Sequence, residues 1–287
     1  MKSIFFWLVV IFFLAFPTYA GESIADREAA SAALNVPILL YHRFGPTVAD
    51  GMTVTTSVFE SHLKYLKDNG YQVIPLRQLI NYYLNRGPKP LSKSVVIVVD
   101  DGHASVYQYL LPLVTAYHVP VTLFIYPSVI SNASYAMTWD QLRDLKKTGL
   151  FDFQGHTYWH PNFKHDQKRM APPEYEKFLD LQLVKSKAKL ERELGVSIDM
   201  LAWPFGIYNE GLLAKAKEAG YAAAFSIEAR PATESEKVMK LPRYLLTNTI
   251  QGKAFERIVQ GKNGGGALMA AGFSQVKRTD STQGRMQ

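Results

Sequence analysis

The stretch VVIVVDDG, Val95 to Gly102, runs from five apolar residues into two adjacent aspartates and a glycine. A continuously apolar run of this kind is typical of a strand that is covered on both faces in a parallel sheet. The two neighbouring carboxylates repel each other, so they require a cation, a shared proton or open water nearby. Asp-Gly is also a common turn dipeptide, and the stretch taken alone favours a solvated turn. The rest of the chain decides between a turn and a reactive site.

Short apolar runs recur along the chain, and most of them follow a helical pattern. At Gly70, Gly149, Gly195 and Gly220 a helical pattern ends and leads directly into an apolar run, as a helix-to-strand connection requires. Strands are predicted over residues 36–41, 71–74, 95–99, 119–125, 151–154, 200–203 and 221–225. This regular alternation predicts an α/β fold, either a (β/α) barrel or a doubly wound sheet.

Two helices can be placed from local signals. Ser57 and Glu60 have the spacing of a capping box and predict the start of one helix. Residues 173–194 contain strong helix formers throughout and predict one long helix.

Composition limits the classes of protein that this chain can represent. Its 287 residues, 47% of them hydrophobic, suit one large domain or two small ones, and no linker divides them. The chain has no cysteine, which excludes disulfides, a thiolate nucleophile and a zinc-thiolate site, so any metal must bind His, Asp or Glu. The net charge of +7 favours association with anionic envelope polymers or lipids. Dense basic clusters are lacking, so nucleic acid is not expected as a partner.

The two ends of the chain predict export and a tail. Lys2 precedes an apolar run over residues 4–16, and small residues end at Ala20, which is typical of a signal peptide covering residues 1–20. The alternative is an uncleaved N-terminal anchor. Export places the protein in the periplasm or outside the cell. Residues 21–261 are predicted to form the catalytic domain, and the glycine-rich and polar residues 262–287 a disordered tail.

Chemically reactive residues follow several of the predicted strands directly. His42 follows the first strand, Asp100 and Asp101 the strand at Val95, His156 the strand at Phe151, and residues 203–206 (WPFG) the strand at Met200. The carboxyl ends of parallel strands are where α/β barrels and sheets build their sites. This shared position favours a catalytic role.

His156 and His160 are four residues apart, a spacing that brings both imidazoles to one side of a turn or short helix. A carboxylate from Asp101 would complete a set of metal ligands with positions left open for water and substrate. Asp100 would then lie beside the metal as a general base, and Gly102 would let the turn point both aspartates at one centre. The alternative is a pair of loop histidines, one packed and one solvated.

In their order along the chain, VDDG, His-x-x-x-His and WPFG resemble the polysaccharide deacetylase family, the NodB-homology carbohydrate esterases. The resemblance runs from about Pro37 to Leu245. It implies a distorted (β/α) barrel, a divalent ion that is usually zinc, and hydrolysis of the N-acetyl amides of N-acetylglucosamine polymers through a tetrahedral intermediate.

By this resemblance, Asp100 is the base and Asp101, His156 and His160 are the metal ligands. A backbone N–H near Phe205 helps to hold the oxyanion, and a rigid loop suits that role because such donors act on charge present only in the transition state. The substrate-binding set that the resemblance implies is Trp203, Pro204, Phe205 and Trp139. The alternative for WPFG is a turn in the core, and for residues 138–140 a helix cap.

Two departures from the family pattern bear on the mechanism. The usual arginine two residues before the proline is Ala202, and the usual Leu-x-His, whose histidine is the general acid, is Leu241-Pro242-Arg243. However, YHRFG at residues 41–45 resembles the branch that acts on poly-β-1,6-N-acetylglucosamine of biofilm matrix. That likeness implies that His42 is the acid and that Arg243 replaces the missing arginine beside Asp100.

The function predicted from the sequence is therefore metal-dependent removal of acetyl groups from an N-acetylglucosamine polysaccharide, with the β-1,6 polymer as the first candidate substrate. Chitin oligomers and peptidoglycan are the alternatives within the enzyme class. A carbohydrate-binding protein without activity is the alternative outside it, and the missing Leu-x-His keeps that alternative open. A non-haem iron oxygenase could use the same ligand types but is disfavoured by the α/β pattern.

Overall fold

The structure is a computed structural model that describes residues 33–262. The predicted signal segment, residues 1–20, and the predicted tail beyond its first residue lie outside the described residues. Within residues 33–262, no helix has both the length and the apolar character needed to cross a membrane.

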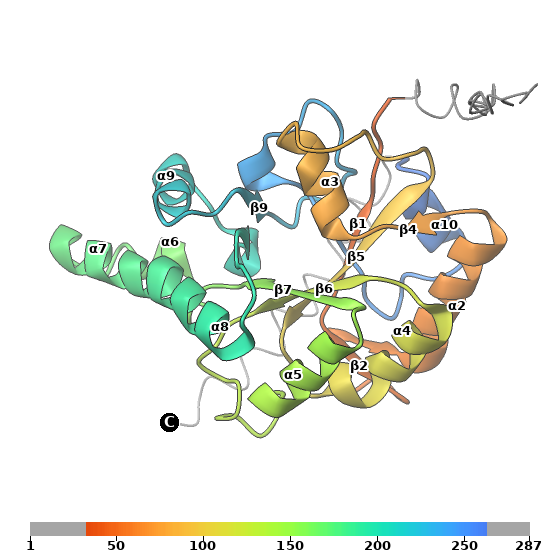
Figure 1. The fold of residues 1–287 in the computed structure, drawn as a ribbon, viewed down its shortest axis with the longest axis horizontal. Coiled ribbons are helices and arrows are strands. Elements are labelled where there is room, and N and C mark those ends of the chain that lie inside the picture. Colours follow the sequence, from red (N-terminus) through yellow and green to blue (C-terminus); the bar gives the residue numbers. More distant parts are fainter. Residues whose placement is uncertain (1–32, 263–287) are drawn as a thin grey trace, which may run out of the picture.

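An eight-stranded sheet forms the centre of the molecule, and every strand pairing in it is parallel (Figure 1). Its order is β10-β1-β5-β6-β7-β8-β9, with β4 paired to β5. The strands are β1 (Ile38–Tyr41), β4 (Gln72–Val73), β5 (Ser94–Asp101), β6 (Val121–Ile125), β7 (Phe151–Gly155), β8 (Met200–Ala202), β9 (Ala223–Phe225) and β10 (Tyr244–Leu245). A separate two-stranded sheet joins β2 (Arg43–Gly45) to β3 (Thr53–Thr55). Each strand predicted from the sequence is present.

The sheet curls until its two edges come close together. Between β9 and β10, Leu241 donates its backbone N–H to Ala224 O (2.8 Å) and accepts from Ser226 N (2.8 Å). These bonds span the gap between the edge strands. The fold is the distorted (β/α) barrel predicted above.

Helices cover the outside of the curled sheet (Figure 1). They are α2 (Thr56–Asp68), α3 (Leu76–Tyr83), α4 (Leu111–Tyr117), α5 (Trp139–Lys147), α6 (Phe163–Asp166), α7 (Pro172–Asp180), α8 (Ser186–Leu194), α9 (Glu210–Glu218) and α10 (Lys253–Val259). Pro204–Gly206 and Val238–Lys240 form 3-10 turns. π-helical turns occupy Val106–Leu110, before α4, and Leu181–Lys185, between α7 and α8. The long helix predicted over residues 173–194 is therefore interrupted by a π turn.

The capping residues differ in part from the prediction. Thr55, rather than Ser57, caps α2, and its hydroxyl accepts from Val58 N at 3.3 Å. Thr138 caps α5 in a reciprocal capping box with Gln141. The first helix therefore begins one residue before Ser57, because a threonine with extended backbone already satisfies its free N–H groups.

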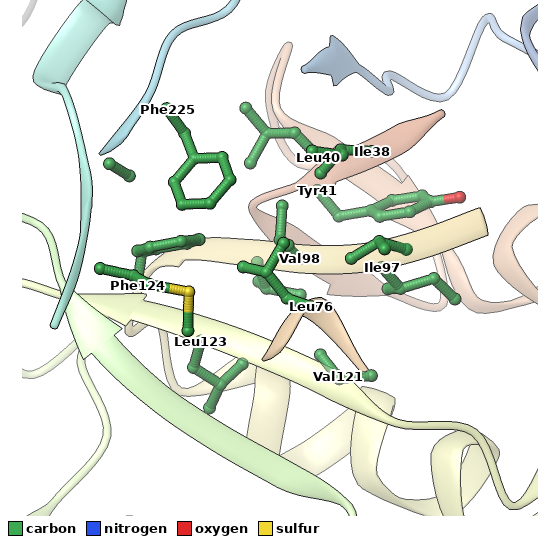
Figure 2. Packing of buried hydrophobic residues seen from close by; sticks show 14 of the residues in the cluster. Ile38, Leu40, Tyr41, Leu76, Ile97, Val98, Val121, Leu123, Phe124 and Phe225 are labelled. Carbon is green, nitrogen blue, oxygen red and sulfur yellow. The ribbon is translucent and has the colours of Figure 1, made fainter. Parts of the chain in front are cut away.

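Aliphatic and aromatic side chains fill the interior of the barrel (Figure 2). Phe124 from β6 faces Phe225 from β9, with ring centroids 5.2 Å apart, and both rings are fully buried. All of β5 is buried up to Asp100, as its continuous apolar run predicts. Replacing either phenylalanine by alanine would cost about 3–5 kcal/mol at such a site.

The first and last described segments meet at the amino ends of the strands. Val36, two residues before β1, pairs with Ala232 in an antiparallel bridge. Gly261, two residues after α10, lies directly against the side chain of Asn35. Both ends therefore leave the barrel at the face opposite to the carboxyl ends of its strands.

Candidate active site

Asp101, His156 and His160 converge at the carboxyl ends of β5 and β7. One ligand atom from each lies within 4.8 Å of the other two. Asp101 Oδ1 is 3.6 Å from His156 Nε2 and 3.9 Å from His160 Nε2. One carboxylate and two imidazoles that share a small space form a ligand set suited to a divalent ion.

The hydrogen bonding of His156 fits metal binding. Its Nδ1–H donates to the carbonyl oxygen of Ala202 at 2.8 Å, so the proton of the neutral ring is on Nδ1. The lone pair of Nε2 therefore faces Asp101 and His160. A backbone carbonyl that fixes the tautomer of a histidine in this way is a usual outer partner of metal ligands. Ala202 stands where the family pattern has arginine. Because the hydrogen bond from His156 is accepted by the backbone carbonyl, it does not depend on which side chain is present at this position.

The pKa of His160 also favours the ligand form of its ring. Burial lowers this pKa to about 4, and the neighbouring His156 lowers it as well, while the Asp101 carboxylate opposes the shift. The imidazole is therefore neutral near pH 7, as a metal ligand must be.

The backbone around the three residues adopts unusual conformations. Asp101, Thr157, His160 and Phe205 have φ values of +79°, +65°, +60° and +56°. Positive φ costs free energy for residues other than glycine, so the surrounding structure must hold each of them in place. Such positions cluster at sites where side-chain direction matters more than local stability.

Gly102 forms the turn after β5, as predicted from the sequence. Its φ is +83°, and a Cβ there would lie 3.0 Å from Ile130 Cδ1. The turn therefore needs both the left-handed conformation and the absence of a side chain. Asp101 shares the positive φ, so two consecutive residues turn the chain after β5.

The loop that carries both histidines is held from outside by the π turn between α7 and α8. Gln182, which is fully buried, accepts from the backbone N–H groups of Tyr158 (3.0 Å) and Trp159 (3.3 Å). Ser186 Oγ donates to Thr157 O at 2.7 Å. The π turn and the first residue of α8 thus present polar side chains to the histidine loop.

Asp100 is buried and forms a bidentate ion pair with Arg243. The two terminal guanidinium nitrogens donate to Asp100 Oδ1 (2.8 Å) and Oδ2 (2.9 Å), and Arg243 Nε donates to Ser226 O at 2.9 Å. The arginine is fully buried, and its guanidinium lies 5.4 Å from the ring centroid of Phe124. Asp100 Oδ2 is also 3.7 Å from His156 Nε2. Arg243 thus lies beside Asp100. Its part in catalysis stays a prediction.

The arginine determines the charge of this carboxyl. Burial alone would raise the pKa of Asp100, but the positive charge of Arg243 and its hydrogen bonds more than offset burial, so the pKa lies below its ordinary value. Asp100 is therefore ionised at neutral pH, in a fixed orientation beside the three candidate ligands.

His42 follows β1 and lies close enough to Asp100, Asp101 and His156 for their charges to act on its ring. Burial lowers its pKa, and the carboxylates of Asp101 and Asp100 oppose the shift. Within the described part of the chain, its Nδ1 is buried with no hydrogen-bond partner. A polar atom left unpaired next to a reactive centre is available to a substrate.

Comparison with known proteins agrees with this geometry. A family model described as polysaccharide deacetylase matches residues 87–224, which include Asp100, Asp101, His156, His160 and Phe205. Residues 87–224 therefore carry a polysaccharide deacetylase domain.

Several relatives of this deacetylase are similar over most of the chain. Poly-beta-1,6-N-acetyl-D-glucosamine N-deacetylase of Staphylococcus aureus (strain MRSA252) is 28% identical over 212 residues, 72% of this chain and 71% of the relative. Two solved structures share the fold. The Streptococcus pyogenes deacetylase PplD in complex with acetate has a TM-score of 0.70 at 21% identity, covering 81% of this chain and 100% of that one. IcaB from Ammonifex degensii has 0.67 at 20% identity, covering 80% and 97%.

The WPFG turn of the deacetylase divides its residues between core and surface. Trp203 is fully buried against Phe163, with ring centroids 5.9 Å apart, and Pro204 is also buried. The predicted contact of these two side chains with substrate is therefore wrong, because neither reaches the surface. Phe205 is 50% exposed, and its ring centroid lies 4.5 Å from that of His160. The oxyanion role of the Phe205 backbone stays a prediction.

Trp139 lies near the histidine loop, with the Lys189 side chain in contact with both. It is the first residue of α5, and Lys189 Nζ lies 6.0 Å from its ring centroid and 5.8 Å from that of Tyr158. Trp139 is thus linked to the loop through a lysine. Its role as a wall of the substrate groove stays a prediction.

Sequence reasoning missed the residues that support the site from outside. Gln182 and Ser186 lie within a long run of helix formers, where a polar residue gives no sign that it faces inward. Tyr126, the residue after β6, was missed as well, although its ring centroid is 5.6 Å from that of His160. Tyr126 follows a predicted strand directly, so the rule that identified His42 and His156 would also have identified it.

Proposed function

We propose that this polysaccharide deacetylase is a metal-dependent hydrolase that removes N-acetyl groups from poly-β-1,6-N-acetylglucosamine. The observation that carries the proposal is the ionised Asp100, clamped by Arg243, beside the ligand set Asp101, His156 and His160. The β-1,6 linkage is supported by the relative of that name at 28% identity.

We propose zinc as the ion, held by Asp101, His156 and His160. Two imidazoles and a carboxylate are a usual zinc set, and they leave room for water and substrate. When bound, the ion would polarise the acetyl carbonyl and lower the pKa of water.

The residues of the chain supply the proton transfers. Asp100 takes a proton from the attacking water as the water oxygen bonds to the acetyl carbon. His42 gives a proton to the amide nitrogen as the carbon–nitrogen bond breaks, which leaves acetate and a free amine on the sugar. His42 must carry that proton beforehand. Burial lowers the pKa of His42, and the nearby carboxylates of Asp101 and Asp100 oppose that shift only in part, so substrate binding would have to favour the charged ring. The backbone N–H of Phe205 is the proposed donor to the oxyanion.

The setting that we propose is the periplasm or the cell exterior, either in solution or held by a retained N-terminal segment. The matrix polymer is found there, and the positive net charge of the chain would favour loose association with an anionic envelope. A nucleic acid is not among the proposed partners.

The test measures acetate release by zinc-loaded protein from β-1,6 and β-1,4 N-acetylglucosamine oligomers in parallel. The β-1,6 oligomers are expected to be preferred. Asp100→Asn and His42→Ala should each lower kcat by about 10²- to 10⁴-fold, because each removes one proton transfer. Zinc content, measured on the same samples, is the control for an intact site.

Each other outcome changes the proposal in a defined way. A preference for β-1,4 oligomers would move the substrate to chitin or peptidoglycan chains. Near-normal turnover by His42→Ala would refute its role as the acid. No acetate from either series, with zinc bound, would favour a carbohydrate-binding protein without activity.

A further inference from the structure

Exposed aromatic side chains gather around the candidate ligands. In the described part of the chain, the exposed large hydrophobic residues are Val48, Leu91, Tyr135, Trp159, Val184 and Phe205. The aromatic members are near the site: Trp159 precedes His160 in sequence, Phe205 packs on His160, and Tyr135 lies in the loop after β6. Exposed rings at a catalytic centre call for an explanation beyond core packing.

Two of these rings are the ends of one line of contacts that crosses the site. The hydroxyl of Tyr135 is 3.3 Å from that of Tyr126. The Tyr126 ring centroid is 5.6 Å from that of His160, which in turn is 4.5 Å from that of Phe205. Tyr135 is 47% exposed and Phe205 is 50% exposed, so the line begins and ends at the surface with a candidate metal ligand between.

The Tyr135 end of this line is held firmly. Its ring stacks on that of His103, with centroids 6.1 Å apart and planes 17° apart. Its carbonyl accepts from Ala104 N at 2.8 Å, and Met137 N donates to Gly102 O at 3.0 Å. The loop is thereby fixed to the turn that carries Asp101. A ring fixed in advance loses little conformational entropy when it binds a ligand.

We propose that the exposed rings of Tyr135 and Phe205 bind the sugar residues on either side of the one that is deacetylated. This inference rests on the proposed function, because it takes the substrate to be a chain of N-acetylglucosamine. Such sugars are uncharged and present apolar C–H faces, which pack on aromatic rings, while the Tyr135 hydroxyl can bond to a sugar hydroxyl. The enzyme would thus act on residues inside a polymer rather than on single sugars.

The order of the strands indicates how a bound sugar chain would lie across the site. Tyr135 is fixed to the turn after β5, the candidate ligands lie after β5 and β7, and Phe205 lies after β8. Because β5, β6, β7 and β8 are neighbours in that order, these positions follow one another along the open edge of the barrel. A polymer lying along this edge would meet both rings.

The test compares Tyr135→Ala with Tyr135→Phe and with the wild type, using acetate release from β-1,6-linked pentamer and dimer. Tyr135→Ala is expected to raise KM for the pentamer about tenfold, the effect of losing one ring contact, and to reduce the preference for pentamer over dimer. The loss should appear in KM rather than in kcat. Tyr135→Phe keeps the ring and should retain the preference. Leu91→Ala removes an exposed apolar side chain remote from the line and is the matched control.

The outcomes separate this inference from the function on which it rests. A wild type that releases acetate, with the same pentamer KM in Tyr135→Ala, would overturn the inference alone. A wild type that releases none from any oligomer would overturn both. Thermal unfolding of each variant identifies a loss caused by misfolding, and Tyr135→Phe then decides whether the ring matters.

Discussion

At the scale of single residues, the ion pair between Asp100 and Arg243 affects both the stability of the fold and the charge of the carboxylate at the candidate site. Both side chains are buried, and each supplies the charge that makes burial of the other tolerable. The same contact keeps Asp100 ionised and limits its rotation. The proposed base is therefore ionised and oriented before a substrate arrives, but the stability of the chain depends strongly on one ion pair.

Arg243→Met is expected to lower the free energy of unfolding by about 3–5 kcal/mol at pH 7, because it leaves a buried carboxylate without its cation. The pKa of Asp100 is depressed in the folded protein, so the pair contributes stability above the ordinary value of 3.8. That contribution is lost as the pH falls through the folded pKa. The difference between wild type and variant should therefore shrink below about pH 4, as measured by urea unfolding at several pH values.

A double variant provides the control for this experiment. Arg243→Met combined with Asp100→Asn removes both charges, and it should recover much of the stability that Arg243→Met loses. An equal loss of stability in the single and double variants would show that packing of the arginine, rather than its charge, is what matters.

The sequence predicted part of the candidate site at this scale. Asp101, His156 and His160 could be grouped because each follows a predicted strand, and parallel strands end at one edge. Arg243 could be placed only through a family likeness, because it lies 143 residues from Asp100 and just before a strand that was not predicted. Trp203 was included in the substrate-binding set because it belongs to the WPFG segment.

At the scale of elements, the π turn between α7 and α8 links a helix pair to the histidine loop. The π turn presents Gln182 to the loop and the first residue of α8 presents Ser186, while helical packing continues on either side. Single-turn π segments within α-helices are frequent at functional sites.

Gln182→Leu is expected to lower stability by about 1–3 kcal/mol, because two backbone N–H groups lose their acceptor in a buried place. Zinc affinity should fall about 10- to 100-fold, since the loop that carries His156 and His160 loses its outer support. Thermal unfolding and zinc titration against a competing chelator measure both effects. Val184→Ala, at an exposed position in the same turn, should change neither. Unaltered zinc affinity in Gln182→Leu would contradict this role.

The elements show which structural signals a sequence carries. Buried strands such as β5 were predicted because their apolar run is continuous on both faces. β2, β3 and β10 were missed because no helix-ending glycine precedes them, and β2 lies within residues that were interpreted as part of a site. β4, β8 and β9 are just as short, but each follows such a glycine. The π turn was missed because one extra residue in a helical turn leaves the composition unchanged.

At the scale of the whole molecule, the candidate ligands join elements that are distant in sequence. Asp101 follows one strand, and His156 and His160 belong to the loop of another. A bound ion would therefore stabilise the tertiary structure as well as the reaction, because it binds only where these elements are assembled.

Removal of the ion by a chelator is expected to abolish acetate release and to lower Tm. Zinc at one hundred times its Kd should contribute about 2.7 kcal/mol, which corresponds to roughly 5–10 °C in a domain of this size. Calorimetry with and without zinc measures the shift. His160→Asn is the matched control, because asparagine tolerates a positive φ while the imidazole is lost, and its Tm should respond much less to zinc. An equal zinc response in His160→Asn would exclude His160 as a ligand.

The meeting of Asn35 with Gly261 has a practical consequence for immobilising this enzyme. A bead, a surface or a fusion partner joined at either end of residues 33–262 would hold the barrel at the amino ends of its strands. The mouth that carries Asp101 and His160 would point away from the support, into the medium. Polymer chains too large to pass between the protein and the support could still reach the candidate site.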